Sequence, residues 1–247
     1  LYLHPDGWAL VLPWLEAFDL RQPAQPEPRP IASWLEIKHR ATGPNPWQQA
    51  AADDRFLALY QGWSDICLLD LEDPFDGDWF CPVWPGLDDL EHFVFADDRL
   101  LTLSYSGELR LYELTTPLSP VFTGGAALPL PITAAWSLVG GDGDVALAVS
   151  RINQWGTYPV EIWSIDLADP ANPVAHDLTG LFQWPFVRDV WFDGRTAVAF
   201  VWDDSFATNK YRLVELDLAN PQSPVVSWTR PMRLEDAALS PPGVVAA

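Results

Sequence analysis

The chain has 247 residues, of which 49% are hydrophobic, 24 are proline and 14 are tryptophan. This much apolar material is enough for a sizeable core, and the many prolines argue against a helical protein. With a formal net charge of −20, the chain shows no basic patch of the kind that binds nucleic acid or anionic lipid. It contains no run of about 18 apolar residues, so the sequence predicts no membrane-spanning segment.

Short alternating runs of β-forming residues follow one another along the chain. The first unit, residues 1–47, contains DGWALVL, EAFDL and RPIASWLEI. The second unit, residues 48–89, contains AAADD, DRFLALY, ICLLDL and DWFCPVW. The same order of runs recurs in three further units, at residues 90–131, 132–186 and 187–233. Four short strands repeated about every 50 residues are typical of β-propeller blades, so the sequence predicts an all-β fold of four-stranded antiparallel blades.

One motif recurs at the end of the third run of each unit. The pattern D-L-x-x-P-x-x-P begins at Asp19, Asp166 and Asp217, and weaker forms begin at Asp70 and Glu113. We interpret it as the hairpin between the third and fourth strands. The aspartate would accept backbone N–H groups of the turn, and the leucine would pack between blades. The first proline would preset φ in the turn, and the second would begin the edge strand, where its missing N–H is tolerated.

Two copies of the motif resemble a known repeat. IWSIDLADPANPV and LVELDLANPQSPV are similar to the LVIVD repeat of bacterial surface and secreted β-propellers. The resemblance implies a scaffold, often extracellular, without an assigned chemistry. The tail LEDAALSPPGVVAA, residues 234–247, aligns with VRDVWFDGRTAVAF at the start of the fifth unit. We therefore expect a single β-propeller domain over residues 1–247, with five repeats and an incomplete sixth.

The two cysteines lie on the third and fourth strands of one unit. Cys67 and Cys81 are symmetric in number about Pro74 in the connecting turn, so a regular register would bring them face to face. A cross-strand disulfide with a Cα separation near ~5.5 Å is then possible, and it would support an oxidising compartment. The alternative is two buried free thiols, because the extended DPFDGD turn could shift the register.

No sequence pattern indicates catalysis or a cofactor. The four histidines lack metal-ligand spacing, and there is neither a G-x-S-x-G elbow nor a phosphate loop. The aspartate pairs fall mostly in turns between first and second strands, where aspartate is a common turn residue, and they would gather acid on one face. Asp142 and Asp144 in GGDGD are one candidate cation site, although the stretch is shorter than an EF-hand loop. We predict no catalytic residue, no metal and no cofactor.

The candidate binding face is formed by variable loops. In a propeller, the loops between second and third strands share one face with the loops between blades, and variable loops on a rigid scaffold tend to carry function. Their aromatic and polar side chains suit a protein or carbohydrate partner; these residues are Trp63, Trp155, Tyr158, Trp184, Phe206, Asp203, Asp204 and Lys210. The alternative interpretation is that the aromatic side chains fold down and cap the blades.

These observations favour a non-enzymatic binding or assembly scaffold, extracellular or on the cell surface, with a protein or carbohydrate partner and without membrane insertion. Two alternatives stay open: an enzyme whose active site is assembled at the propeller axis, and a structural subunit of a larger extracellular complex. Ionisable groups with perturbed pKa values at the axis would favour the enzyme. An exposed apolar patch on an outer edge would favour assembly.

Overall fold

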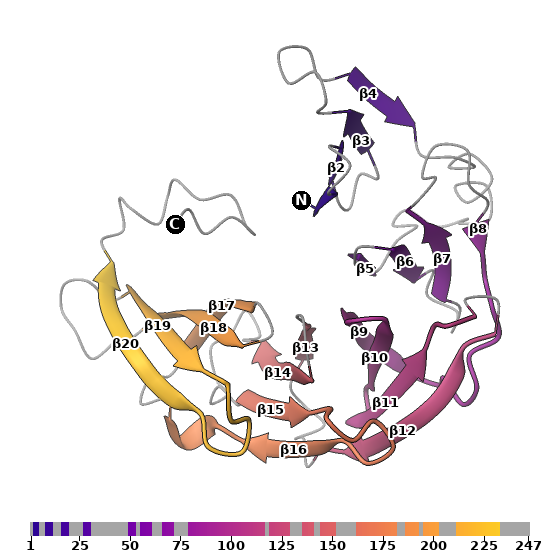
Figure 1. The fold of residues 1–247 in the computed structure, drawn as a ribbon. Helices are drawn as coiled ribbons and strands as arrows, with labels where there is room; N and C mark the ends of the chain where they lie inside the picture. The colour runs from indigo at the N-terminus through magenta and orange to yellow at the C-terminus, as the bar shows by residue number, and fades with distance from the viewer. Residues whose placement is uncertain are drawn as a thin grey trace. The chain divides into compact units, whose positions relative to one another are not determined.

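The computed structural model describes the strands and part of the connections between them. The described residues are 2–4, 8–11, 16–19, 27–30, 49–52, 55–60, 66–71, 79–116, 119–128, 135–140, 144–151, 162–181, 186–192, 195–202 and 211–232. They are all-β apart from one 3-10 turn, Thr179–Leu181, and they form five four-stranded sheets (Figure 1). The expected all-β architecture of four-stranded antiparallel sheets is confirmed.

Each sheet is built from four consecutive strands. The first contains β1 (Tyr2–His4), β2 (Trp8–Val11), β3 (Glu16–Asp19) and β4 (Glu27–Pro30). The second contains β5 (Gln49–Ala52), β6 (Phe56–Tyr60), β7 (Ile66–Asp70) and β8 (Trp79–Phe80). The third contains β9 (Leu90–Ala96), β10 (Arg99–Ser104), β11 (Glu108–Glu113) and β12 (Val121–Ala127). The fourth contains β13 (Ala135–Val139), β14 (Val145–Arg151), β15 (Ile162–Asp166) and β16 (Val174–Asp177), and the fifth contains β17 (Phe186–Phe192), β18 (Thr196–Trp202), β19 (Tyr211–Asp217) and β20 (Val225–Met232).

Burial falls from the middle strands of a sheet to its outer strand. All five residues of β6 are buried, and so are the first four of β7. The outer strands β12 and β16 instead carry several exposed residues. A strand that is covered on both faces reads as a continuous apolar run, and an edge strand does not. The runs FLALY and ICLL therefore mark middle strands.

The chain forms two compact units. One comprises residues 1–89 and 112–122, and the other comprises residues 90–111 and 123–247. Within the second unit, the first strands of successive sheets lie side by side, β9 with β13 and β13 with β17. One apolar core joins the third sheet to the fourth, and another joins the fourth to the fifth. Consecutive sheets of this unit therefore pack face to face.

The motif forms the expected hairpin turn in the copies at Asp166 and Asp217. The Asp166 carboxylate accepts the N–H of Ala168 at 3.0 Å, and the Asp217 carboxylate accepts the N–H of Ala219 at 2.9 Å. The second proline of each copy is buried directly before the outer strand; these prolines are Pro173 and Pro224. The proposed roles of the aspartate and of the second proline are thus confirmed in both copies.

The leucine of the motif is buried and also holds the neighbouring turn. The N–H of Leu167 donates to the carbonyl of Asp144 at 2.7 Å, and the N–H of Leu218 donates to the carbonyl of Arg195 at 2.8 Å. Asp144 and Arg195 directly precede the second strands of their sheets. The hairpin between strands three and four is therefore tied to the turn between strands one and two at the same end of the sheet. In the copies where the structure describes it, this leucine is buried; these residues are Leu71, Leu114, Leu167 and Leu218.

Each motif hairpin of the fourth and fifth sheets lies on the preceding sheet. Gly124 of β12 lies against the backbone carbonyl groups of Pro170 and Ala171 in the β15–β16 turn. The hydroxyl of Ser164 on β15, which is fully buried, donates to the carbonyl of Pro221 in the β19–β20 turn at 2.7 Å. The repeated motif thus serves as the contact between neighbouring sheets of the second unit.

The outer strand of the second sheet is shorter than expected. The run DWFCPVW predicts a strand, but β8 contains only Trp79 and Phe80. Pro82 has no N–H for a ladder, and the indole of Trp84 turns inward to donate to the carbonyl of Ile66 at 2.8 Å. The missing N–H of Pro82 therefore limits the strand, and the chain beyond it turns Trp84 toward the core.

Candidate functional site

The loop residues predicted for the binding face are outside the described residues. They are Trp63, Trp155, Tyr158, Trp184, Phe206, Asp203, Asp204 and Lys210. One part of that face is described in the third sheet, where the N–H of Leu128 donates to the carbonyl of Gly107 at 2.8 Å. This contact places the C-terminal end of β12 beside the β10–β11 turn, which contains the exposed Tyr105.

The two cysteines form a disulfide. Cys67 and Cys81 are bonded, with Cα atoms 4.1 Å apart. The strand pairs Leu68–Phe80 and Leu69–Trp79 are symmetric about Pro74, so the β7–β8 register is the regular one. The first of the two alternatives left open by the sequence is therefore present. The disulfide fixes the start of the connection between the second and third sheets.

The connection that follows the disulfide, residues 81–89, is held in one conformation by its own sequence. The N–H of Leu87 donates to the carbonyl of Trp84 at 3.2 Å, which closes a β-turn around Pro85 and Gly86. Gly86 has φ 69°. Proline at the second position and a positive-φ glycine at the third are the requirements of a type II turn. The stretch WPGL therefore forms a rigid corner.

Two side-chain hydrogen bonds attach this corner to the core. The indole N–H of Trp84 donates to Ile66, and the hydroxyl of Tyr112 donates to the carbonyl of Pro85 at 3.0 Å. The rings of Trp84 and Tyr112 lie edge to face with centroids 5.3 Å apart, and Tyr112 contacts Phe122 in the same way at 6.0 Å. Edge-to-face pairs stabilise the structure by more than the burial of the rings alone. Backbone and aromatic contacts thus fix the loop from several sides.

Apolar side chains remain exposed on this fixed framework. Val83 is 86% exposed between two buried residues, Pro82 and Trp84. Phe122 is 46% exposed at the other end of the aromatic row, and its neighbour Val121 is 51% exposed. We call the four residues Val83, Trp84, Tyr112 and Phe122 the loop cluster. It combines the buried, hydrogen-bonded Trp84 and Tyr112 with the exposed apolar Val83 and Phe122.

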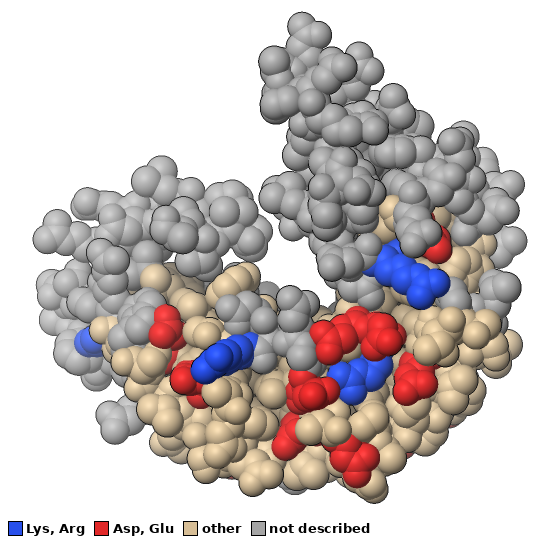
Figure 2. Space-filling model, viewed as in Figure 1, with Lys and Arg blue, Asp and Glu red and all other residues tan. Residues whose placement is uncertain are grey.

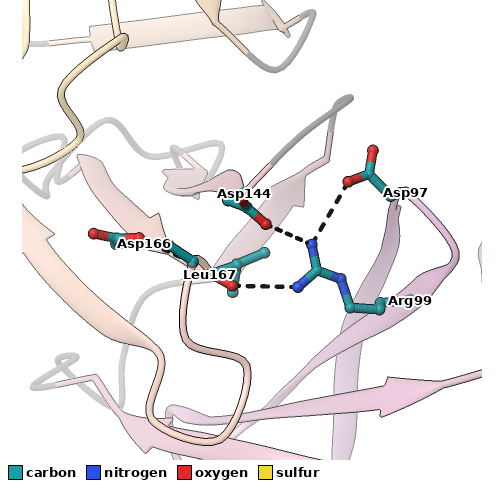
Figure 3. A network of polar contacts seen from close by, with 6 residues as sticks. Asp97, Arg99, Asp144, Asp166 and Leu167 are labelled. Carbon is teal, nitrogen blue, oxygen red and sulfur yellow. Dashed lines mark hydrogen bonds and ion pairs between the residues drawn. The ribbon is translucent and has the colours of Figure 1, made fainter.

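A buried arginine lies at the end of the second unit where the D-L-x-x-P-x-x-P hairpins turn. Arg99 is only 8% exposed, and its guanidinium donates to the carbonyl of Leu167 at 3.2 Å and to the carboxylate of Asp144 at 3.0 Å (Figure 3). Asp97 lies 3.6 Å from the same guanidinium. Figure 2 shows acidic side chains gathered around basic ones on this face. Arg99 therefore joins the third sheet to the turns of the fourth.

Asp144, one residue of the candidate cation site, has a structural partner in Arg99. Its carboxylate oxygen Oδ1 accepts from Arg99, and a cation there would be placed against the guanidinium. Asp142, the other residue of the candidate cation site, is outside the described residues. Among the residues that the structure describes, no group of three or more His, Cys, Asp or Glu side chains is arranged to hold a metal.

The sequence interpretation missed the loop cluster, although two signals for it were present. WPG predicts a type II turn, and the disulfide alternative at Cys81 already implied a fixed loop start. The exposure of Val83 could not be read from the sequence, because Val83 lies in an apolar run that also fits a buried strand.

Comparisons with known proteins give fold similarities alone. No family model matches the chain, and no curated protein matches it. The N-terminal domain of Nup159 is similar with 14% identity and a TM-score of 0.46, over 81% of this chain and 52% of that one. The computationally designed Ika8 protein has 8% identity and a TM-score of 0.46, over 73% and 48% of the two chains.

BamB from Moraxella catarrhalis has 11% identity and a TM-score of 0.40, over 74% of this chain and 49% of that one. The chain thus spans about half the length of each of these three solved structures. In the described part of the chain, no helix has the length and apolar character needed to cross a membrane.

Proposed function

We propose that the chain is a β-propeller that acts as a non-enzymatic scaffold for binding or assembling other proteins. Five four-stranded sheets in chain order support the propeller, as do the first strands that lie side by side in the second unit and the hairpins that rest on the preceding sheet. The resemblance of the motif to LVIVD repeats supports the same class of scaffold.

One observation carries the binding function. Val83 exposes 86% of its surface on a loop that a disulfide, a type II turn and two side-chain hydrogen bonds hold in place. Fixing a loop in advance lowers the entropy that a complex loses when it forms. An apolar side chain on such a loop gains free energy only when a partner covers it.

The chemistry of the surface favours a protein partner over a carbohydrate. Sugars are held by flat aromatic faces together with many hydrogen-bonding groups, whereas Val83 and Val121 offer branched aliphatic surface. Phe122 begins the outermost strand of its sheet together with Val121. An exposed apolar surface on an outer strand also favours assembly into a larger complex. The scaffold and structural-subunit interpretations therefore both predict that the protein is found in a complex with other proteins.

The disulfide supports a location outside the reducing cytosol. Cys67 is 1% exposed and bonded to Cys81. Disulfides of this kind persist in secreted, periplasmic or cell-surface proteins. We therefore propose an extracellular or cell-surface protein.

The apparent native mass of the protein in material from the cells that make it tests the scaffold function. Wild-type protein is expected to migrate in a complex larger than its 27.6 kDa chain. The variant Val83→Ser/Phe122→Ser is expected to move to the mass of the free protein, while the control Trp191→Ser, which removes an exposed aromatic side chain on β17, stays in the complex. Wild-type protein that migrates only at its own mass would contradict the proposal.

A further inference from the structure

We propose that the loop cluster binds a protein segment in which an apolar side chain is flanked by arginine or lysine. This inference rests on the proposed scaffold function and specifies its partner. The apolar residue would cover Val83 and the exposed part of Phe122. The basic residues would face the carboxylates beside the cluster.

The geometry supplies a fixed apolar anchor. Val83 lies between Pro82 and Trp84, both buried, so its direction is set by the residues on either side. Trp84 is attached to Ile66, and Tyr112 holds the carbonyl of Pro85. A partner therefore meets a preformed surface and does not have to order the loop.

The aromatic row extends this anchor to a second exposed residue. Trp84 contacts Tyr112, and Tyr112 contacts Phe122, at centroid distances of 5.3 and 6.0 Å. Phe122 and Val121 are each about half exposed. The buried rings of Trp84 and Tyr112 connect the two exposed ends through packed side chains. The exposed part of Phe122 therefore adds a second apolar contact for a partner.

The charge around the cluster selects a basic partner. Segments 81–89 and 112–122 contain Asp88, Asp89 and Glu113 and no lysine, arginine or histidine. Asp88 and Asp89 are exposed, and Glu113 is partly exposed. Opposite charge at the rim of an apolar site speeds encounter and excludes partners of the wrong sign.

The same charge argues against a second copy of this chain as the partner. Each copy carries a formal net charge of −20, and an interface between two copies of this surface would oppose carboxylates to carboxylates. A basic segment of a different protein meets no such repulsion. The observations therefore favour a heterologous partner.

Amide chemical-shift titration of the oxidised, isotope-labelled full chain tests the inference. The probe is the acetylated and amidated peptide Gly-Arg-Leu-Val-Arg-Gly. The matched peptides are Gly-Glu-Leu-Val-Glu-Gly, which reverses the charge, and Gly-Arg-Ser-Gly-Arg-Gly, which removes the apolar pair. A short peptide with so few contacts is expected to bind with a Kd on the order of 1 mM.

We expect the first peptide to shift the amides of Val83, Gly86 and Phe122 and to bind at least about tenfold more tightly than either matched peptide. Raising the salt from about 0.05 to about 0.5 M is expected to weaken its binding at least about threefold. The variants Val83→Ser and Asp88→Asn/Asp89→Asn should each weaken binding about fivefold or more. The controls Trp191→Ser and Asp98→Asn alter exposed residues outside segments 81–89 and 112–122 and should leave binding unchanged.

Equal binding of the acidic peptide, shifts confined to other parts of the chain, or self-association through Val83 would overturn the inference. A native complex that survives Val83→Ser, together with no peptide shift at the cluster, would also overturn it and would leave the scaffold function standing. Absence of any native complex of the wild-type protein would instead contradict the scaffold function itself.

Discussion

The guanidinium of Arg99 donates to the main-chain carbonyl of Leu167, which lies 68 residues further along the chain, at 3.2 Å. Leu167 is the second residue of a repeated hairpin motif, and Arg99 begins a strand of the preceding sheet. The same guanidinium contacts the carboxylate of Asp144. One buried arginine therefore attaches the hairpin and the first turn of one sheet to the sheet before it.

Replacing Arg99 tests the stabilising role of this contact. Arg99→Met keeps the length of the side chain but removes the donors to Leu167 and Asp144, and it is expected to lower the free energy of unfolding by about 1–3 kcal/mol. Arg110→Met removes a more exposed ion pair with Glu108 and should cost less than about 1 kcal/mol. Urea unfolding at constant ionic strength compares the two variants. Equal losses would show that the buried contact adds nothing to stability.

Gly124 is expected to be irreplaceable, whereas its neighbour is not. A Cβ atom at position 124 would overlap the carbonyl oxygens of Pro170 and Ala171, and backbone atoms cannot turn aside as a flexible side chain can. Gly124→Ala should destabilise the protein by about 1–3 kcal/mol. The exposed Gly125 has no positive φ, so Gly125→Ala should be neutral or slightly stabilising. A thermal unfolding scan of the two variants would reveal the difference, and similar melting temperatures would count against the hairpin contact.

The two residues that begin the motif should differ in their contribution to stability. Leu167 is fully buried, and Leu167→Ala is expected to cost about 2–5 kcal/mol through the cavity it leaves. Asp166 is partly exposed and holds one turn N–H, so Asp166→Ala should cost only about 0.5–1.5 kcal/mol. Chemical denaturation of the two single variants measures both costs. A larger loss at Asp166 would mean that the turn hydrogen bond, and not the packing of the leucine, dominates the motif.

Reduction of the disulfide should loosen the loop cluster before it unfolds the protein. Cys67 and Cys81 are separated by 14 residues, and closing a loop of this size stabilises a fold by about 3 kcal/mol. The variant Cys67→Ala/Cys81→Ala should lose about 2–4 kcal/mol. Its amides at residues 83–87 should exchange with deuterium faster, while those of β14 and β15 keep their protection. Uniform acceleration across the whole chain would contradict a local role.

The repeat made much of the fold readable from the sequence. Alternation and the recurring D-L-x-x-P-x-x-P motif located the strands, because the copies at Asp166 and Asp217 pair a turn-capping carboxylate with a buried leucine. The number symmetry of Cys67 and Cys81 about Pro74 predicted the register in which they meet. The turn hydrogen bonds and the hairpin register depend on residues close in sequence, where local rules decide the structure.

The candidate site was less readable, because it depends on contacts between distant residues. Trp84 is buried only because Ile66 supplies a carbonyl and Tyr112 supplies a ring. The exposure of Val83 follows from that burial, and no local pattern encodes it. The aromatic residues chosen on sequence grounds, such as Trp155 and Trp184, are outside the described residues, and their role as a binding face remains a prediction.

Site-specific photo-crosslinking in the cells that make the protein is the most direct measurement of its binding function. A benzophenone side chain is placed at Phe122, which is 46% exposed, and, as the matched control, at Trp191, which is 48% exposed. We predict one discrete covalent adduct with another protein at position 122, abolished by Val83→Ser, and no such adduct at position 191. Adducts only at position 191, or none at position 122 under conditions where the protein is folded, would contradict binding through the loop cluster.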